Sequence, residues 1–260
     1  MSLVSFAPLR RRALFTSMLI LAAGLLTTAP AVADETKGLS GIQKQAIEKM
    51  IHQYIMDHPE VLLESVKKHQ EAREQARQEH AKQALAVLSK ELNGDPASPV
   101  SGNPNGNVTV VEFFDYRCGY CKRVHPAIQK LLEDDKGVKF VFKEFPILGP
   151  ESMIAARAAL AVWNTNRDKY VAFHDALMTG RGAVSEAAIM KLAAQVGIKA
   201  DALKKAMGDA EIDAALARNF QLAEALNING TPAFVVGDQL VPGAVDLAKL
   251  KELIATARGS

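Results

Sequence analysis

A run of β-branched and aromatic residues leads directly into a pair of cysteines at the start of a helical pattern. Residues Val108 to Phe114 (VTVVEFF) follow Asn105-Gly106 and predict a buried strand. Cys118 and Cys121 come next, and apolar residues recur at helical spacing from Lys122 to Leu132. The sequence thus places a CxxC motif on the first turn of a helix that directly follows a strand.

Composition places the chain among globular proteins. Of 260 residues, 48% are hydrophobic and 23% are charged, which excludes a disordered chain and an integral membrane bundle. The net charge of +2, from 31 basic and 29 acidic residues, gives no electrostatic case for nucleic-acid binding. Two cysteines cannot hold a small disulfide-stapled fold. We expect one main domain with an appendage.

Residues 1–33 have the layout of a secretory signal peptide. Arg10 to Arg12 precede the charge-free stretch from Ala13 to Leu26, and a small-x-small cleavage sequence ends at Ala33. The apolar stretch is shorter than the ~20 residues that a spanning helix needs. Cleavage after Ala33 would leave 28 basic and 29 acidic residues and a net charge of −1. We therefore expect an exported chain without a further membrane span, in a compartment where disulfides persist.

The segment after the signal peptide predicts long helices. Apolar residues recur every three or four positions from Leu39 to Ile55, and proline ends this pattern at Asp57-His58-Pro59. The pattern resumes from Val61 to Val66, is interrupted over residues 67–83, and returns from Ala84 to Leu92. Asn93 to Pro96 closes the helix, with Gly94 expected as a left-handed cap. The sequence thus divides into a helical arm and linker over residues 34–94 and a domain over residues 95–260.

Such an arm cannot bury its apolar stripe against itself. One alternative is that it packs on its own domain; the other is that residues 39–66 pair with the same segment of other subunits. Residues 67–83 carry alternating charges and would then form a solvated helical spacer. The arm also contains scattered histidines, for which a metal site or a pH sensor is the less common explanation. These are His52, His58, His69 and His80.

The position of the two cysteines predicts thiol chemistry. A disulfide that closes so short a ring gains little loop entropy, so it is weak as a structural staple but readily reduced. Cys118 falls at the helix N-terminus, where unpaired N–H groups favour an anion and a populated thiolate. Cys121 lies one turn inside the helix. We expect Cys118 to be the exposed, attacking sulfur and Cys121 the buried, resolving one.

Metal and haem sites are the rival interpretations of this motif. A tetrahedral zinc site needs four ligands; His125 offers a third, but no fourth is evident. Covalent haem attachment requires histidine directly after Cys121, where Lys122 stands. We expect no metal and no cofactor beyond a redox-active Cys118–Cys121 disulfide.

Two segments together resemble a known family. Phe113 to Arg123 (FFDYRCGYCKR) and Gly230 to Phe234 (GTPAF) are similar to the bacterial Dsb branch of the thioredoxin superfamily, and most similar to its ScsC and Com1-type proteins. The resemblance covers nearly the whole mature chain. It implies an α/β thioredoxin fold with a DsbA-like helical insertion over residues 150–226, preceded by an α-helical N-terminal oligomerisation arm.

The resemblance also assigns roles to single residues. Thr231-Pro232 matches the family's cis-proline pair, which faces the active-site disulfide and binds substrate backbone. Glu112 matches the buried strand glutamate, and Lys143, on the strand Val138 to Phe145, its partner. This pair would lie under the helix and tune proton transfer to and from Cys121; an ordinary edge pair is the alternative. Pro126 matches a proline that kinks the helix.

The residues between the cysteines favour one direction of reaction. Gly119-Tyr120 is the dipeptide of the DsbC-type isomerases, whereas strong DsbA-type oxidases carry Pro-His, whose histidine stabilises the thiolate. We expect a periplasmic disulfide isomerase that binds client proteins partly through Gly119 and Tyr120. A thiol oxidase, a client-specific reductase and a non-enzymatic chaperone remain alternatives. The implied partners are a DsbD-like membrane reductase and copies of the same chain, a trimer before a dimer.

The remaining sequence predicts the surrounding elements. Several helices occupy residues 150–226, with Ser185 and Asp201 as N-caps and Gly197 as a cap at a helix end. Trp163 and the aromatic residues near it belong to the core. A hairpin turns through Gly237-Asp238, and a last helix covers Asp246 to Ala257.

Overall fold

The computed structural model describes residues 38–259. They form two compact units, of which the first ends at Glu64 and the second begins at Ser65. The predicted signal peptide over residues 1–33 lies outside the described residues. The division of the chain at residue 94 stays a prediction.

Helix α1 (Gly41–Asp57) begins at Ser40, whose side chain accepts a hydrogen bond from the Gln43 backbone while the Gln43 side chain bonds back to Ser40. It ends before His58, and α2 (Pro59–Val87) begins with proline at its first position. Proline has no N–H to donate and is tolerated there. The break predicted at residues 57–59 is therefore confirmed.

The apolar side chains of α1 and the start of α2 are exposed. No residue of α1 is buried. Most large hydrophobic side chains of this segment are 40% exposed or more, while Ile47 and Ile55 are half-buried. So much exposed apolar surface is unusual. The most exposed are Ile42, Met50, Ile51, Tyr54, Met56, Leu62, Leu63 and Val66.

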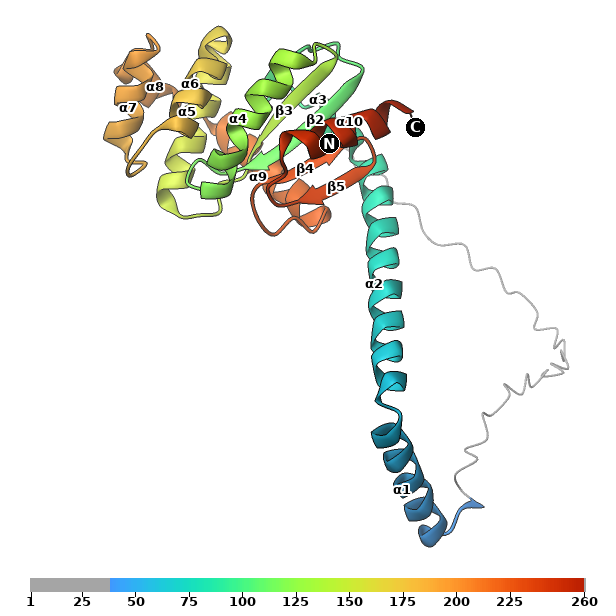
Figure 1. Cartoon of the computed structure of the whole chain (residues 1–260). Coiled ribbons are helices and arrows are strands. Elements are labelled where there is room, and N and C mark those ends of the chain that lie inside the picture. The colour runs from blue at the N-terminus through green and yellow to red at the C-terminus, as the bar shows by residue number, and fades with distance from the viewer. Residues whose placement is uncertain (1–37, 260) are drawn as a thin grey trace, which may run out of the picture. The chain divides into compact units, whose positions relative to one another are not determined.

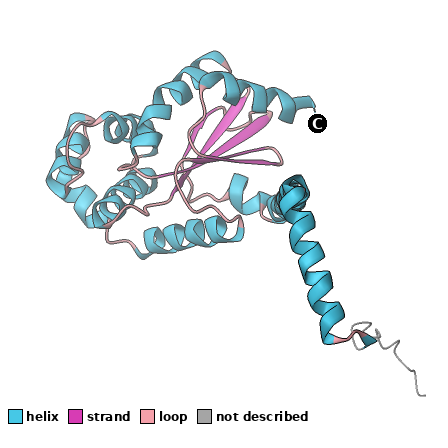
Figure 2. Cartoon of the chain, turned by 60° about the horizontal axis from the view of Figure 1, so that its bottom comes forward, coloured by secondary structure: helices cyan, strands magenta, loops and turns pink. Residues whose placement is uncertain are grey.

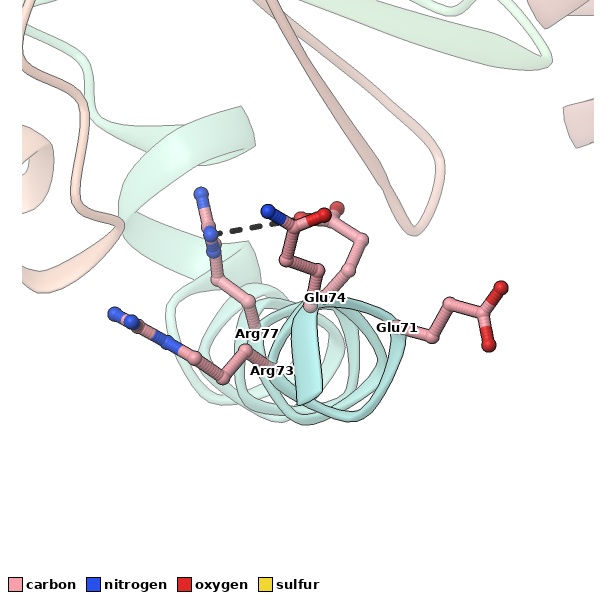
Figure 3. Close-up of a pocket in the computed structure, with 5 residues that line it drawn as sticks. Glu71, Arg73, Glu74 and Arg77 are labelled. Carbon is pink, nitrogen blue, oxygen red and sulfur yellow. Dashed lines mark ion pairs between the residues drawn. The ribbon is translucent and has the colours of Figure 1, made fainter. Parts of the chain in front are cut away.

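The middle of α2 is charged and solvated. Figure 3 shows Glu71, Arg73, Glu74 and Arg77 pointing outward from this helix, with an ion pair between Arg77 Nη2 and Glu74 Oε2 at 3.6 Å. Lys67 forms a second pair with Glu71 at 3.9 Å. Exposed pairs of this kind add little stability.

The end of α2 and the short α3 (Ser89–Gly94) pack into the second unit. Leu85 is 4% exposed and Leu92 is 1% exposed, and both belong to a core cluster that includes Phe113 of the sheet. Gly94 is the last residue of α3 and lies outside the left-handed region, so the predicted left-handed cap is wrong.

Five strands form one mixed sheet in the order β1-β3-β2-β4-β5 (Figures 1 and 2). The strands are β1 (Val100–Gly102), β2 (Val108–Phe114), β3 (Val138–Glu144), β4 (Ala233–Val236) and β5 (Gln239–Pro242). Strands β2 and β3 are parallel, and the other neighbours are antiparallel. The strand β1 was not predicted, because three partly exposed residues carry too little pattern.

Helices cover both faces of the sheet (Figure 2). One face carries α4 (Gly119–Asp134) and α10 (Leu247–Gly259), whose apolar residues cluster with Val110, Phe140 and Phe234. The other carries α9 (Ala210–Ala225) and the end of α2, which cluster with Val111 and Val235. Among the described residues, none of the helices is long and apolar enough to cross a membrane.

The predicted helical insertion contains α5 (Pro150–Thr165), α6 (Arg167–Thr179), α7 (Glu186–Gln195) and α8 (Ala200–Ala206) ahead of α9. Ser185 caps α7 through its side chain, as predicted, and Gly197 after that helix has a φ of 76°. Asp201 is not a cap: Lys199 precedes α8, and Asp201 lies inside its first turn. Trp163 packs against the core and donates to the Pro96 carbonyl at 3.1 Å.

Candidate active site

The turn between β2 and α4 is held by one buried carboxylate. Asp115 Oδ1 accepts from the Arg117 backbone at 2.7 Å and from Ser152 Oγ at 2.8 Å. Asp115 Oδ2 accepts from the Leu148 backbone at 3.0 Å. Because these donors belong to the turn and to the segment that enters α5, Asp115 fixes the position from which Cys118 begins α4.

Cys118 occupies the N-cap of α4, with φ −71° and ψ 115° and no side-chain capping bond. Its thiol donates to the carbonyl oxygen of Thr231 at 3.2 Å. The residue is 6% exposed, so the expectation of an exposed sulfur is wrong. The Thr231 loop covers it, a contact between segments too far apart in sequence for local pattern to predict.

The Thr231-Pro232 peptide bond is cis. Pro232 is buried at the start of β4, and its carbonyl oxygen accepts from the Gly243 backbone at 2.9 Å. The loop predicted to face the cysteines therefore lies against Cys118. The Thr231 carbonyl lies beside the sulfur of Cys118, and the substrate-binding role of Thr231 and Pro232 stays a prediction.

Cys121 lies in the first turn of α4, and Glu112 lies on β2, on the sheet face that α4 covers. Cys121 is fully buried, and burial first, then the charge of Glu112, raise the pKa of its thiol. Glu112 is 1% exposed, and neither carboxylate oxygen has a hydrogen-bond partner among the described residues. Burial, followed by the charge of Cys118, raises the pKa of Glu112 to about 8. An unpartnered acid of this kind can exchange a proton with a nearby thiol near neutral pH.

The predicted pairing of Glu112 with Lys143 is wrong. In the parallel register of β2 and β3, Lys143 lies opposite Phe113, whereas Glu112 lies opposite Phe142. Successive side chains of a strand point to opposite faces. Glu112 therefore points toward α4, and Lys143 points to the other side of the sheet.

Lys143 instead ties α3 to the sheet. Its Nζ donates to the Glu91 carbonyl at 2.8 Å and to Ser98 Oγ at 2.7 Å, and it lies 3.9 Å from Asp95 Oδ2. Burial lowers the pKa of Lys143 to about 8. The residue has a structural position and does not reach the cysteines.

The two residues between the cysteines face solvent. Tyr120 is 57% exposed, and the Arg123 guanidinium lies 4.9 Å from the centre of its ring. A Cβ added at Gly119 would meet nothing within 4 Å. Gly119 and Tyr120 are thus available to a bound polypeptide beside Cys118.

The two cysteines are not part of a group of side chains that could hold a metal ion among the described residues. Both cysteines are free thiols. Within residues 38–259, no three His, Cys, Asp or Glu side chains are grouped to hold a metal ion. His125 instead pairs with Asp175 at 3.0 Å between Nε2 and Oδ1.

Residues 109–255 match the DSBA-like thioredoxin domain. The chain belongs to this family. Residues 43–76 match a second family, the copper resistance protein ScsC N-terminal domain. The resemblance inferred from the two sequence segments is confirmed for both parts of the chain, and so is the DsbA-like thioredoxin fold.

Three known proteins illustrate the relationship. Disulfide bond formation protein D of Bacillus subtilis is 31% identical over 176 residues, which is 63% of this chain and 79% of that protein. A thioredoxin-like oxidoreductase from Silicibacter pomeroyi is 45% identical, with a TM-score of 0.64, over 66% of this chain and 98% of that one. Proteus mirabilis ScsC in a transitional conformation is 29% identical, with a TM-score of 0.64. The match covers 85% of this chain and 99% of that one.

Two matches, both to Na(+)/H(+) antiporters, cover a much smaller part of their relatives, 24% and 25% of the antiporters' length. The chain is 26% identical to the Na(+)/H(+) antiporter NhaA 1 of Salinispora arenicola over 160 residues, which is only 24% of the antiporter's length. Family membership and the cysteine geometry together make the chain a thiol:disulfide oxidoreductase of the DsbA/ScsC type.

Sequence reasoning missed two parts of the site. Asp115 stands inside the quoted motif, but nothing in the sequence shows that its carboxylate would bind the chain near Leu148 and Ser152. A buried polar cluster around Glu144 and His174 was missed as well. Its members come from distant segments, so only the packed domain brings them together.

Proposed function

We propose that this protein is a periplasmic disulfide isomerase that reshuffles wrong disulfides in exported client proteins. The observation that carries the proposal is the contact of Cys118 with the Thr231 carbonyl at 3.2 Å, above a buried Cys121. This arrangement offers a sulfur at the N-cap position of a helix, next to backbone that can pair with an extended client. The signal-like residues 1–33 support export.

In the proposed mechanism, the Cys118 thiolate attacks a client disulfide. A mixed disulfide forms, and one client sulfur leaves as a thiolate that takes a proton from water. Another client thiolate then attacks the client sulfur bonded to Cys118 and forms a new client disulfide. Cys118 is released reduced, so isomerisation needs no net electrons.

Cys121 provides an exit from a stalled complex. Its sulfur attacks Cys118, forms the Cys118–Cys121 disulfide and releases the client sulfur that was bonded to Cys118. The client then has two reduced thiols in place of its original disulfide. The protein is then oxidised by two electrons. A DsbD-like membrane reductase, donating from a dithiol, would restore it.

Two features support isomerisation over oxidation. Tyr120 stands where the strong oxidases have histidine, so no imidazolium between the cysteines stabilises the thiolate. The exposed apolar side chains of α1 and the start of α2 also suit association with copies of the same segment, as a trimer or, second, a dimer. Several active sites around one client can engage the same disulfides repeatedly.

The test measures recovery of activity by scrambled ribonuclease in the presence of the reduced protein. We expect recovery with the native chain and none with Cys118→Ser. If a control isomerase restores the ribonuclease but this chain restores no more activity than buffer does, the proposed isomerase activity is refuted.

Thiol oxidation is the second candidate, because one relative is named for disulfide bond formation. An oxidase keeps its cysteines as a disulfide in cells, whereas an isomerase keeps them reduced. Trapping the thiols in periplasmic extracts, with and without a membrane electron donor, distinguishes the two. A client-specific reductase would be reduced in cells but would not restore scrambled ribonuclease.

A further inference from the structure

Behind the active-site turn lies a cluster of titratable side chains that the steps above do not use. Five of its six members are at most 3% exposed, whereas the side chain of the sixth, Asp175, is 34% exposed. They come from the turn after β2, from β3, from α4 and from α6. The members are Tyr116, His125, Glu144, Tyr170, His174 and Asp175.

These groups form a chain of contacts from the surface into the core. Asp175 Oδ1 lies 3.0 Å from His125 Nε2, and the rings of His125 and His174 lie 5.3 Å apart. His174 Nδ1 lies 3.0 Å from the Tyr116 hydroxyl, which donates to Glu144 Oε1 at 3.1 Å. Tyr170 stacks on His174 with ring centres 5.8 Å apart.

The inner end of this chain lies near Glu112. Glu144 is opposite Phe114 in the strand register, and Glu112 is opposite Phe142. Since Glu112 and Phe114 are two positions apart on one strand, Glu112 and Glu144 share the face beneath α4. Both carboxyls are buried on this face, and among the described residues no hydrogen bond joins them.

The protonation states of the cluster suit proton exchange. Burial first, then the charge of His125, lower the pKa of His174 to about 3, so its ring is neutral. Its Nε2 has no hydrogen-bond partner among the described residues. A neutral imidazole can accept a proton at one nitrogen and release one from the other. Burial raises the pKa of Glu144, the hydrogen bond from Tyr116 lowers it, and the neighbouring Asp115 and Glu112 raise it further.

We propose that this cluster is a proton relay connecting solvent at Asp175 with Glu112 beneath Cys121. When Cys121 attacks Cys118, its thiol proton passes to the Glu112 carboxylate. The Cys118–Cys121 bond forms, the bond from Cys118 to the client breaks, and the client thiolate takes a proton from water. Glu112, itself buried, then releases its proton along the cluster. The relay residues act through Glu112 and are positioning residues.

The inference rests on the proposed exchange chemistry of Cys118 and holds for isomerase, oxidase or reductase. The test reacts the reduced full chain with a fluorescent peptide carrying a disulfide. A first phase reports attack by Cys118, and a second reports release of the peptide by Cys121. Both phases are followed from about pH 5 to about pH 9, in H2O and D2O.

Two variants interrupt the relay at its ends. Glu144→Gln keeps the shape but cannot titrate, and we expect it to slow the second phase about tenfold near neutral pH and to shift its pH profile. Asp175→Asn should slow the same phase about threefold. Glu144→Asp should restore most of the rate. Asp168→Asn, an exposed carboxylate on the same helix, is the matched control and should change neither phase.

The outcomes separate this inference from the proposed function. If folded Glu144→Gln or Asp175→Asn shows native second-phase rates, pH profile and solvent isotope effect, the relay is wrong while the exchange chemistry stands. If Glu144→Gln fails to fold, Asp175→Asn at the surface decides alone. If the native chain forms no mixed disulfide, the proposed function fails and the relay with it.

Discussion

At the scale of single residues, the most consequential side chain is Glu112. It is a buried carboxyl without the expected lysine partner, and its pKa rises from 4.5 to about 8. Below pH 4.5 the folded and unfolded chains both hold this proton. As pH rises toward 8, the unfolded chain loses the proton while the folded one keeps it. Glu112 therefore destabilises the fold progressively across this interval.

The variant Glu112→Gln removes that ionisation. We expect it to be more stable than the native chain by about 1 to 3 kcal/mol at alkaline pH and nearly equal in acid, because only the ionised acid is costly in the core. Thermal unfolding across this pH range measures the difference. If the melting temperatures of the two chains depended equally on pH, the pKa of Glu112 would not be raised in the folded protein. The same variant should slow release by Cys121.

The two cysteines differ in burial, and their serine variants should differ accordingly. Cys121→Ser removes the resolving sulfur, so mixed disulfides between Cys118 and clients should accumulate. Cys118→Ser should form none, because Cys121 is fully buried. Non-reducing gels of periplasmic extracts measure these adducts. Equal adducts from both variants would contradict the assignment of Cys118 as the attacking sulfur.

At the scale of elements, Asp115 joins β2, the start of α4 and the segment before α5. Asp115→Ala would leave three donors without their acceptor, on Arg117, Leu148 and Ser152. We expect a loss of about 2 to 4 kcal/mol in the free energy of unfolding and slower attack by Cys118. Denaturant unfolding and alkylation kinetics measure the two effects.

A matched variant separates these contributions. Ser152→Ala removes only one of the donors and should cost about 1 kcal/mol, with little change in Cys118 reactivity. If Asp115→Ala proved no more damaging than Ser152→Ala, the carboxylate would not be what holds the turn.

At the scale of the whole molecule, the arm determines whether several active sites act together. Replacing Ile51 and Tyr54 by Glu places charges on the exposed apolar stripe, and we expect a monomer that retains peptide exchange but loses isomerase activity. Light scattering and the ribonuclease assay measure the two properties. Val87→Glu is the control, because Val87 is even more exposed, at 79%, and lies outside the stripe. A native chain that is already monomeric would refute the proposed association.

Truncation of the arm has to respect the core of the second unit. Leu85 and Leu92 are buried against the sheet, so a deletion that reaches them would open a cavity costing about 2 to 5 kcal/mol for each leucine. A deletion that ends before Leu85 removes the exposed stripe and keeps this packing. Only such a deletion tests association without damaging the domain.

Local pattern was enough to predict much of the protein. The strand from Val108 to Phe114, the helix that Cys118 begins, and the break at Pro59 each follow from neighbouring residues, because backbone hydrogen bonding and side-chain periodicity act over a few positions. The spaced motifs also identified the family. The sequence alone therefore determined the fold class, whereas the roles of the two sulfurs stay predictions.

Other features depended on how distant segments meet. Whether Lys143 faces Glu112 is decided by the register of β2 on β3, and a difference of one residue moves a side chain to the opposite face of the sheet. The cover that Thr231 places on Cys118 likewise exists only once β4 lies beside β2. Tertiary structure alone decided the proton environment of the site, because burial and charge at a buried group are set by its neighbours in space rather than along the chain.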